Sequence, residues 1–122
     1  MIECNVKGAL SYEDAKKIAK SVITSNLIKC MFFGKDANWG RIMCAVGYAG
    51  VDINPGKIDV FINGIKIVSK GKGLKNKKKV KKTLNKKEAS VLIDIHKGKK
   101  EATAYGCDLT IKYVKLNAHY TT

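Results

Sequence analysis

This chain lacks the sequence features that mark membrane proteins, disordered proteins and disulfide-rich secreted proteins. No apolar run approaches the roughly 18 residues that a membrane span needs, and the first residues carry neither the basic nor the apolar segment of a secretory signal. One proline and eleven glycines among 122 residues do not make a disordered composition, and 45% of the chain is hydrophobic. The sequence therefore predicts a single domain over residues 1–122, located in the cytoplasm.

Cysteine is sparse, and it never occurs in the C-x-x-C spacing that favours zinc binding or redox chemistry. All four cysteines have apolar neighbours in the sequence: Cys4, Cys30, Cys44 and Cys107. In a cytoplasmic protein this pattern favours reduced thiols in the core over disulfides or metal ligands. We therefore expect no bound metal.

Acidic residues are scarce as well, and the formal net charge is +14. The segment from Lys66 to Lys100 supplies +12 of it, and such a lysine cluster can bind phosphates without reading a sequence. Modules that read nucleic acids usually use arginine forks or aromatic platforms, but Arg41 is the single arginine and no aromatic residue lies between Phe61 and Tyr105. We interpret the segment as a solvated helix face. A small polyanion- or nucleic-acid-binding module, using nonspecific lysine contacts, is the alternative function.

Apolar spacing in the first third of the chain predicts a helix followed by a strand. Ser11 and Asp14 have the spacing of a capping box, and apolar residues at helical intervals follow them to Ile23. Residues 27–33 form a mostly apolar run that reads as a strand ended by Gly34.

A second helix is predicted from Trp39 to Val46, with Asp36 or Asn38 as its cap. Apolar residues surround this helix on nearly every side, so we expect it to be buried. The glycines in and after it lower helix propensity and indicate close packing or early termination: Gly40, Gly47 and Gly50.

The middle of the chain carries the strongest local signal. Alternating apolar residues at 58–62 and 65–67 flank Asn63-Gly64, which predicts a β-hairpin with a type I′ turn. A lysine-rich helix follows around residues 76–87, with Val80 and Leu84 as its apolar anchors.

The last third of the chain reads as strands. Apolar residues alternate from Val91 to Ile95, and the chain turns near Lys97-Gly98 into one long final strand through residues 106–110. The whole pattern predicts a mixed α/β domain, with helices packed on a partly antiparallel sheet.

Four motifs occur in a fixed order along the chain. They are F-G-K-D-A-N-W-G-R from Phe33 to Arg41, G-Y-A-G from Gly47 to Gly50, G-C-D-L-T from Gly106 to Thr110, and a tail with Asn117 and Thr122. Together they resemble the carboxyl-terminal part of the ornithine acetyltransferases (glutamate N-acetyltransferases) of arginine biosynthesis. The resemblance covers nearly the whole chain, and four ordered matches are far more specific than any one of them.

The resemblance implies that residues 1–122 are the carboxyl-terminal portion of a larger, self-cleaving acetyltransferase. Family members are several times longer and cut themselves before a threonine, which becomes the nucleophile that carries the acetyl group from N-acetylornithine to glutamate. That threonine and the oxyanion donors have no counterpart here, and the family's substrate-binding glutamate falls just before Met1. We therefore expect no catalytic residue in this chain, and no activity from the chain alone.

The same resemblance implies which other polypeptides this chain works with and which acetyl donors the enzyme uses. The partners are the alpha chain and the amino-terminal part of the beta chain, in an oligomeric enzyme. No metal or organic cofactor is implied, although some family members also use acetyl-CoA as the acetyl donor.

By this resemblance, Asn117 and Thr122 are the candidate substrate-binding residues. Three others are candidates for supporting the site or, equally, for a structural role as a helix cap, a buried indole and a paired guanidinium: Asn38, Trp39 and Arg41. Asp108 is expected to accept backbone hydrogen bonds near a strand bend, in support of the site. His119 and Thr121 depart from the commonest family tail.

An independent Cys/His hydrolase is a weaker alternative. Cys107 is followed by His119 and preceded by His96, but closeness in sequence is not catalytic geometry. A lone cysteine between glycine and aspartate is more often a packed thiol.

Overall fold

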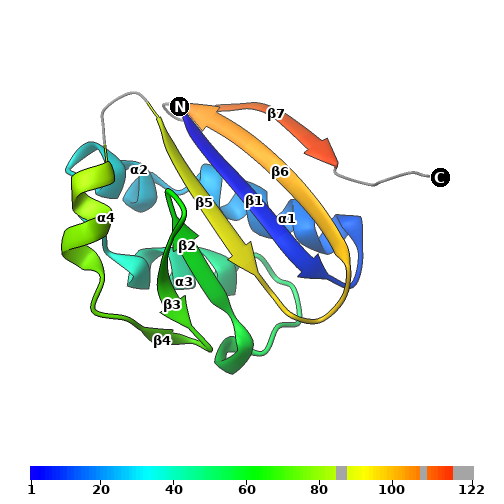
Figure 1. Cartoon of the computed structure of the whole chain (residues 1–122). Helices are drawn as coiled ribbons and strands as arrows, with labels where there is room; N and C mark the ends of the chain where they lie inside the picture. Colours follow the sequence, from blue (N-terminus) through cyan, green and yellow to red (C-terminus); the bar gives the residue numbers. More distant parts are fainter. Residues whose placement is uncertain (85–87, 108–109, 117–122) are drawn as a thin grey trace.

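One mixed sheet runs through the computed structural model, which describes residues 1–84, 88–107 and 110–116. Within these residues the sheet has seven strands in the order β4-β3-β2-β5-β1-β6-β7 (Figure 1). β1 pairs with β5 in parallel, and the other neighbours are antiparallel. The strands are β1 (Ile2–Ala9), β2 (Asp59–Ile62), β3 (Ile65–Ser69), β4 (Lys72–Gly73), β5 (Ala89–Asp94), β6 (Lys100–Cys107) and β7 (Thr110–Leu116).

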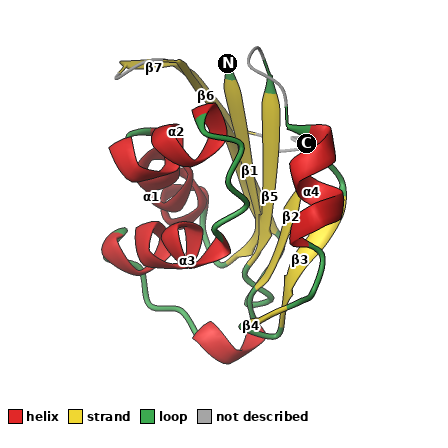
Figure 2. Ribbon diagram, turned by 90° about the vertical axis from the view of Figure 1, so that its left-hand side faces the viewer, coloured by secondary structure: helices red, strands yellow, loops and turns green. Residues whose placement is uncertain are grey.

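Three helices, α1 (Tyr12–Ile23), α2 (Asn26–Phe33) and α3 (Trp39–Tyr48), form a layer on one face of the sheet (Figure 2). The fourth, α4 (Lys77–Thr83), lies apart from this layer beside β3, and a 3-10 turn, η1 (Pro55–Lys57), precedes β2. The core fills the space between the helix layer and the sheet. The expected mixed α/β fold with packed helices is confirmed.

The first predicted helix is confirmed as α1. Ser11 caps it, because its hydroxyl oxygen accepts a hydrogen bond from the Asp14 amide at 3.1 Å. The apolar face packs against β1 and β6, and its buried side chains are Ala15, Ile18, Ala19, Val22 and Ile23. β1, which the sequence did not indicate, lies inside the sheet between β5 and β6.

The strand predicted at residues 27–33 is wrong, because this segment is α2. Ser25 begins the helix, with its hydroxyl accepting from the Ile28 amide at 3.3 Å, and Gly34 ends it. Ile28, Met31 and Phe32 are buried at helical spacing. A short apolar run does not distinguish a strand from a helix by periodicity, and the cap decides in favour of the helix.

α3 begins at Trp39 as expected and ends at Tyr48, two residues later than predicted, but the prediction that it is buried on nearly every side is wrong. Ile42, Ala45 and Val46 face the core, whereas Cys44 is exposed and Tyr48 is 87% exposed. The helix lies in the outer layer, so only one of its faces has a neighbour to pack against (Figure 2). Close packing does not explain Gly47, since a Cβ there would meet no atom within 4 Å, whereas a Cβ at Gly40 would lie 3.2 Å from Asn38 Oδ1.

The predicted hairpin is confirmed as β2 and β3. Asn63 and Gly64 have φ values of 48° and 81°, the left-handed pair that a type I′ turn requires. The single long final strand is wrong, since the chain reverses after β6 and returns as β7, with Cys107 opposite Thr110. Gly106, the first residue of the third motif, stands opposite Ile111, next to a register shift between β6 and β7.

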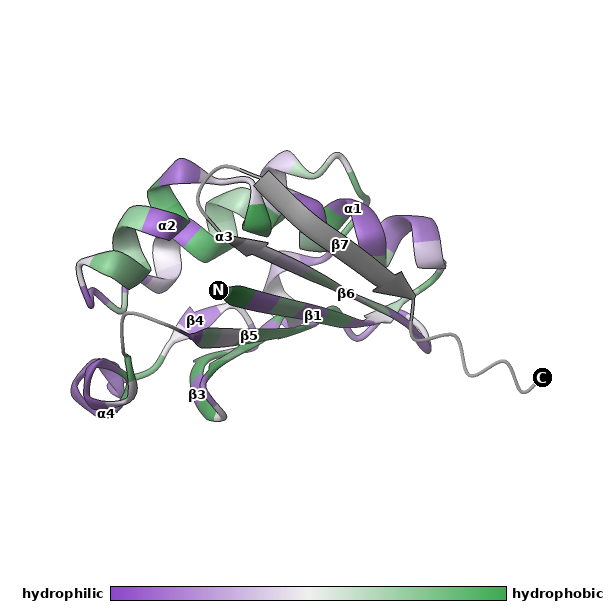
Figure 3. Ribbon diagram, turned by 90° about the horizontal axis from the view of Figure 1, so that it is seen from above, coloured by the Kyte–Doolittle hydropathy of each residue, from purple (hydrophilic) through white to green (hydrophobic). Residues whose placement is uncertain are grey.

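The lysine-rich helix is confirmed as α4, although it ends at Thr83. Val80 and Leu84 are buried as predicted, and hydrophilic residues cover the rest of the helix (Figure 3). None of the helices in the described residues is long and apolar enough to cross a membrane.

The expectation of core thiols holds for one cysteine and fails for two. Cys4 is fully buried in β1, and burial raises the pKa of its thiol. Cys30 and Cys44 are free but exposed, so for them the expectation is wrong. They lie on the outer faces of α2 and α3, where apolar neighbours in the sequence do not guarantee burial. The Cys107 side chain lies outside the described residues.

Candidate functional site

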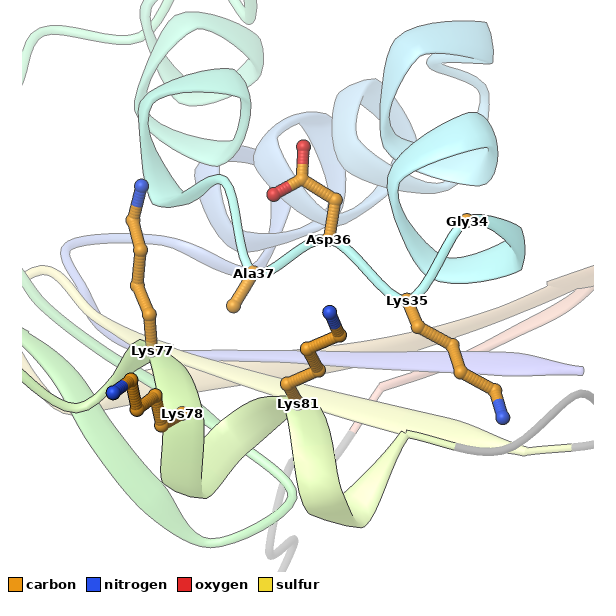
Figure 4. Close-up of a pocket in the computed structure, with 7 residues that line it drawn as sticks. All are labelled: Gly34, Lys35, Asp36, Ala37, Lys77, Lys78 and Lys81. Atoms are coloured by element: carbon orange, nitrogen blue, oxygen red, sulfur yellow. The ribbon is translucent and has the colours of Figure 1, made fainter.

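The first motif folds into a loop that faces α4 across a pocket. The pocket has a volume of ≈ 320 Å³ and is lined by Gly34, Lys35, Asp36, Ala37, Lys77, Lys78 and Lys81 (Figure 4). The loop is held by main-chain hydrogen bonds, including one from the Asp36 amide to the Met31 carbonyl at 2.8 Å. Ala37 is only 3% exposed and fixes the loop to the core. The pocket therefore has a rigid wall on the motif side.

Trp39 and Arg41, two of the candidates for site support, make structural contacts. The indole of Trp39 lies so close to Gly73 of β4 that a Cβ there would overlap the ring. The Arg41 guanidinium donates a hydrogen bond from Nη1 to the Leu27 carbonyl at 3.0 Å, which ties α3 to the start of α2. These contacts support the structural alternative, and a role toward substrate stays a prediction.

Asn38, the third candidate, stands at the N-cap position of α3, but its side chain makes no capping hydrogen bond. Its backbone carbonyl accepts from the Arg41 amide at 3.1 Å instead. Asp36, the other predicted cap, does not occupy the N-cap position. Main-chain hydrogen bonds therefore shape this loop. The side-chain amide of Asn38 has no capping role.

A second pocket lies near the third motif, which begins at Gly106, at the end of the sheet where β1 and β5 begin and β6 ends. It has a volume of ≈ 200 Å³ and is lined by Met1, Glu3, Glu88, Ala89, Ser90 and Tyr105. The strand register explains the convergence, because Glu3 stands opposite Ser90 on one side and Tyr105 on the other. Two carboxylates, a hydroxyl and a phenol at this edge are suited to holding an ammonium group.

The sequence gives no sign of this acidic pocket, because Glu3 and Glu88 are far apart in the chain and only the sheet brings them together. Asp108, Asn117 and Thr122, which the resemblance assigns to the site, lie outside the described residues. The two pockets share no lining residue. The loop from Gly34 to Ala37 and the strand ends that carry Glu3 and Tyr105 therefore line separate pockets.

A histidine between two carboxylates occupies the opposite end of the sheet. His96 Nε2 lies 2.8 Å from Asp59 Oδ2, and its Nδ1 lies 3.6 Å from Asp94 Oδ1. Burial acts to raise the pKa of Asp59, but the Lys70 amide, His96 and Lys66 outweigh it and hold this pKa below its usual value. His96 has a positive φ of 57°, so the backbone is strained at the point where the ring is held.

This placement contradicts a hydrolase built from His96 and Cys107. Cys107 ends β6 beside the start of β1, whereas His96 follows β5 near the end of β1. An eight-residue strand such as β1 separates its two ends by about 20 Å. His119, the other histidine considered, lies outside the described residues.

Lys29 is an unexpected buried cation in α2. The residue is 4% exposed, and its Nζ has no hydrogen-bond partner among the described residues. A buried ammonium without a partner is costly, so such a group demands an explanation in any native structure. The sequence did not indicate that the one lysine in this apolar run would itself be buried.

Metal ligands do not gather in the part of the chain that the structure describes. There, no group of three or more histidine, cysteine, aspartate or glutamate side chains could hold an ion. The acidic pocket offers two carboxylates from Glu3 and Glu88, which suit an organic cation better than a transition metal.

Comparison with known proteins gives a consistent result over the whole chain. A model described as the ArgJ family matches residues 1–122. The chain is 45% identical over 123 residues to the arginine biosynthesis bifunctional protein ArgJ of Oceanobacillus iheyensis, covering 100% of this chain and 30% of that protein. It is 48% identical over 125 residues to arginine biosynthesis bifunctional protein ArgJ 1 of Clostridium acetobutylicum, covering 98% of this chain and 31% of the relative.

The fold agrees with these sequence matches. A crystal structure of the arginine biosynthesis bifunctional protein ArgJ of Bacillus halodurans matches with a TM-score of 0.83 and 34% identity, over 89% of this chain and 52% of that one. The chain thus spans about 30% of the length of the curated relatives it matches. The resemblance to ornithine acetyltransferases is confirmed, and the chain belongs to the ArgJ family.

Proposed function

We propose that this chain is part of a glutamate N-acetyltransferase (ornithine acetyltransferase) that transfers acetyl from N-acetylornithine to glutamate in arginine biosynthesis. The observation that carries the proposal is the family match over all 122 residues, joined to identities of 45% and 48% with proteins named for arginine biosynthesis. The proposed enzyme is cytoplasmic and oligomeric, and acetyl-CoA is a possible second donor for it.

The chemistry is assigned to the portion of the relatives that this chain does not span. There a threonine hydroxyl attacks the acetyl carbonyl of N-acetylornithine, the ornithine amine leaves, and the glutamate amine then takes the acetyl group from the acyl-threonine. Hydrogen-bond donors in that portion stabilise the oxyanion at each step. The present chain supplies groups that recognise the amino acid, and Asn117 and Thr122 are the residues proposed for this.

The acidic pocket supports the proposal. Glu3 and Glu88 lie at the end of the sheet where β6 finishes with Gly106 and Cys107, the first two residues of the third motif. Amino-acid substrates carry an ammonium group, and carboxylates hold such a group by charge-assisted hydrogen bonds. The pocket therefore has the chemistry that one end of the proposed substrate requires.

The first test is activity. The 122-residue chain should transfer no acetyl group between N-acetylornithine and glutamate, whereas a mixture with the preceding portion of an ArgJ relative should do so. Turnover by the pure chain would contradict the assignment of the nucleophile to the other portion. Failure of the mixture, with both parts folded and bound to each other, would contradict the acetyltransferase proposal.

The second test addresses the proposed substrate residues in a complete enzyme that carries this chain. Removing one polar partner from a desolvated site costs about 1–3 kcal/mol. Asn117→Ala, or deletion of Thr122, should therefore lower kcat/KM by about tenfold or more and leave the Tm nearly unchanged. Full activity in both variants, or loss of activity only through unfolding, would make the tail structural.

The polyanion-binding alternative has narrower support. Lysines do gather between the first motif and α4, but the described residues that line that pocket include no arginine and no aromatic ring. Base recognition needs such groups. Nucleic acid is therefore a poor match for the Lys66–Lys100 segment beyond nonspecific contacts.

A further inference from the structure

Five lysines from two separate parts of the chain surround one concave surface. Lys35 comes from the loop after α2, and the others come from α4. They line the pocket of ≈ 320 Å³ and an adjoining one of ≈ 440 Å³, which share Lys35, Lys78 and Lys81. We call this continuous surface the lysine groove, and its cations are Lys35, Lys77, Lys78, Lys81 and Lys82.

The positive charge of the lysine groove is not neutralised within the described residues. There, the ion pairs of lysines involve Lys7, Lys66 and Lys97, none of which lines the groove. Asp36 is the one carboxylate among the described lining residues, and its side chain points away from α4 (Figure 4). Lys77 and Lys81 are four residues apart on the helix, a spacing at which like charges repel.

Both walls of the lysine groove are fixed by contacts that do not involve its lysines. On the helix side, Val80 is fully buried and Asn63 donates to the Thr83 carbonyl and hydroxyl at 3.2 and 3.0 Å. On the loop side, Ala37 is buried and the Asp36 amide is bonded to the Met31 carbonyl. The ammonium groups of Lys77 and Lys81 extend from α4 toward the loop (Figure 4). The backbone positions that carry the lysines are therefore fixed before a ligand enters, which lowers the entropic cost of binding.

We propose that the lysine groove binds the diphosphate or triphosphate group of a small phosphorylated compound. Lysine ammonium groups are compact point charges that pair with phosphate oxygens, and several of them around one hollow favour a ligand with several negative charges. A hollow between a loop and a helix suits a compact anion, whereas an extended nucleic acid needs a charged track with stacking platforms. This site goes beyond acetyl transfer and is separate from the acidic pocket.

Calorimetric titration of the 122-residue chain at about 0.1 M salt, where the Debye length is about 10 Å, tests the proposal. The probes are inorganic phosphate, ADP and tripolyphosphate, with affinity expected to rise in that order. Lys78→Gln with Lys81→Gln should weaken tripolyphosphate binding by about tenfold or more. The matched control is Lys16→Gln with Lys17→Gln on α1, which removes the same charge and should change the affinity less than about twofold.

Lys35→Gln provides a second variant on the opposite wall, so that the test does not depend on the stability of α4. It should also weaken tripolyphosphate binding, and thermal unfolding should confirm that each variant is folded. Equal losses in the groove and control pairs, or no binding of tripolyphosphate, would overturn the proposal. Tighter binding of a single-stranded 12-nucleotide DNA than of tripolyphosphate, lost in the groove variants, would replace it with a nucleic-acid site.

Discussion

The indole of Trp39 packs directly on the backbone of Gly73, at the point where β4 closes the edge of the sheet. A side chain at position 73 would occupy the space of the ring. This contact joins the first motif to a strand 34 positions later in the chain, so the edge strand and the entry to α3 depend on each other.

Gly73→Ala should destabilise the chain by about 1–3 kcal/mol, because the added methyl group forces the indole or the strand to move. Gly47→Ala in α3 is the matched control, since a Cβ there meets nothing within 4 Å. It should stabilise the chain by about 0.5–1 kcal/mol through helix propensity. Urea unfolding measures both. Equal effects of the two substitutions would show that the ring adapts without cost.

Asn63 should contribute stability through its side chain as well as through its turn conformation. Its Nδ2 donates to Thr83, and its Oδ1 accepts from the Ser90 amide at 2.8 Å, so it joins the hairpin to the end of α4 and to β5. Asn63→Gly keeps the positive φ accessible and removes these bonds. We expect a loss of about 1–3 kcal/mol and faster amide exchange in α4. Unchanged exchange in α4 would mean that its apolar anchors hold it alone.

Asp59 should make the stability depend on acid pH. Its pKa is lowered in the folded state, so its contribution is present above the unfolded pKa of about 3.9 and is lost as pH falls through the folded pKa. Asp59→Asn should therefore be less stable than the parent by about 1–2 kcal/mol near pH 6, and this difference should vanish in stronger acid.

Asp52→Asn is the control for this experiment. Asp52 pairs with Lys97 at 3.2 Å, but its side chain is 97% exposed, and exposed ion pairs contribute little. Its unfolding curves should follow the parent at every pH. A difference between Asp59→Asn and the parent that stayed constant down to pH 2 would contradict the assigned pKa shift.

Lys29→Met should stabilise the isolated chain. The Lys29 ammonium is buried without a partner in the described residues, and an apolar side chain of similar length removes the cost of its desolvation. We expect a gain of about 1–3 kcal/mol in the free energy of unfolding. Lys17→Met on the exposed face of α1 should change it by less than about 0.5 kcal/mol. Destabilisation by Lys29→Met would indicate a partner for the ammonium.

Much of the local structure could be predicted from the sequence, because the decisive interactions connect near neighbours. Ser11 caps α1 through an amide three residues away, and Asn63-Gly64 adopts the turn that its own backbone preferences favour. Val80 and Leu84 anchor α4 as their spacing predicts. The family followed from four ordered motifs, whose recognition needs no coordinates.

The site could be predicted only in part. Trp39 and Arg41 were identified as candidates, but their contacts with Gly73 and Leu27 are visible only in three dimensions. Glu3 and Glu88 were not identified at all, because only the pairing of β1 with β5 brings these two residues to the same pocket. The pairing of β1 with β5 and with β6 also places Cys107 and His96 near opposite ends of β1.

Local sequence by itself determined where helices cap, where the hairpin turns and to which family the chain belongs. Only the tertiary structure decided that the chain reverses after β6, that Cys30 and Cys44 are exposed and that the first motif faces the lysines of α4. The physical reason is that capping and turn energies depend on residues a few positions apart, whereas burial and strand pairing depend on which distant segment covers each face.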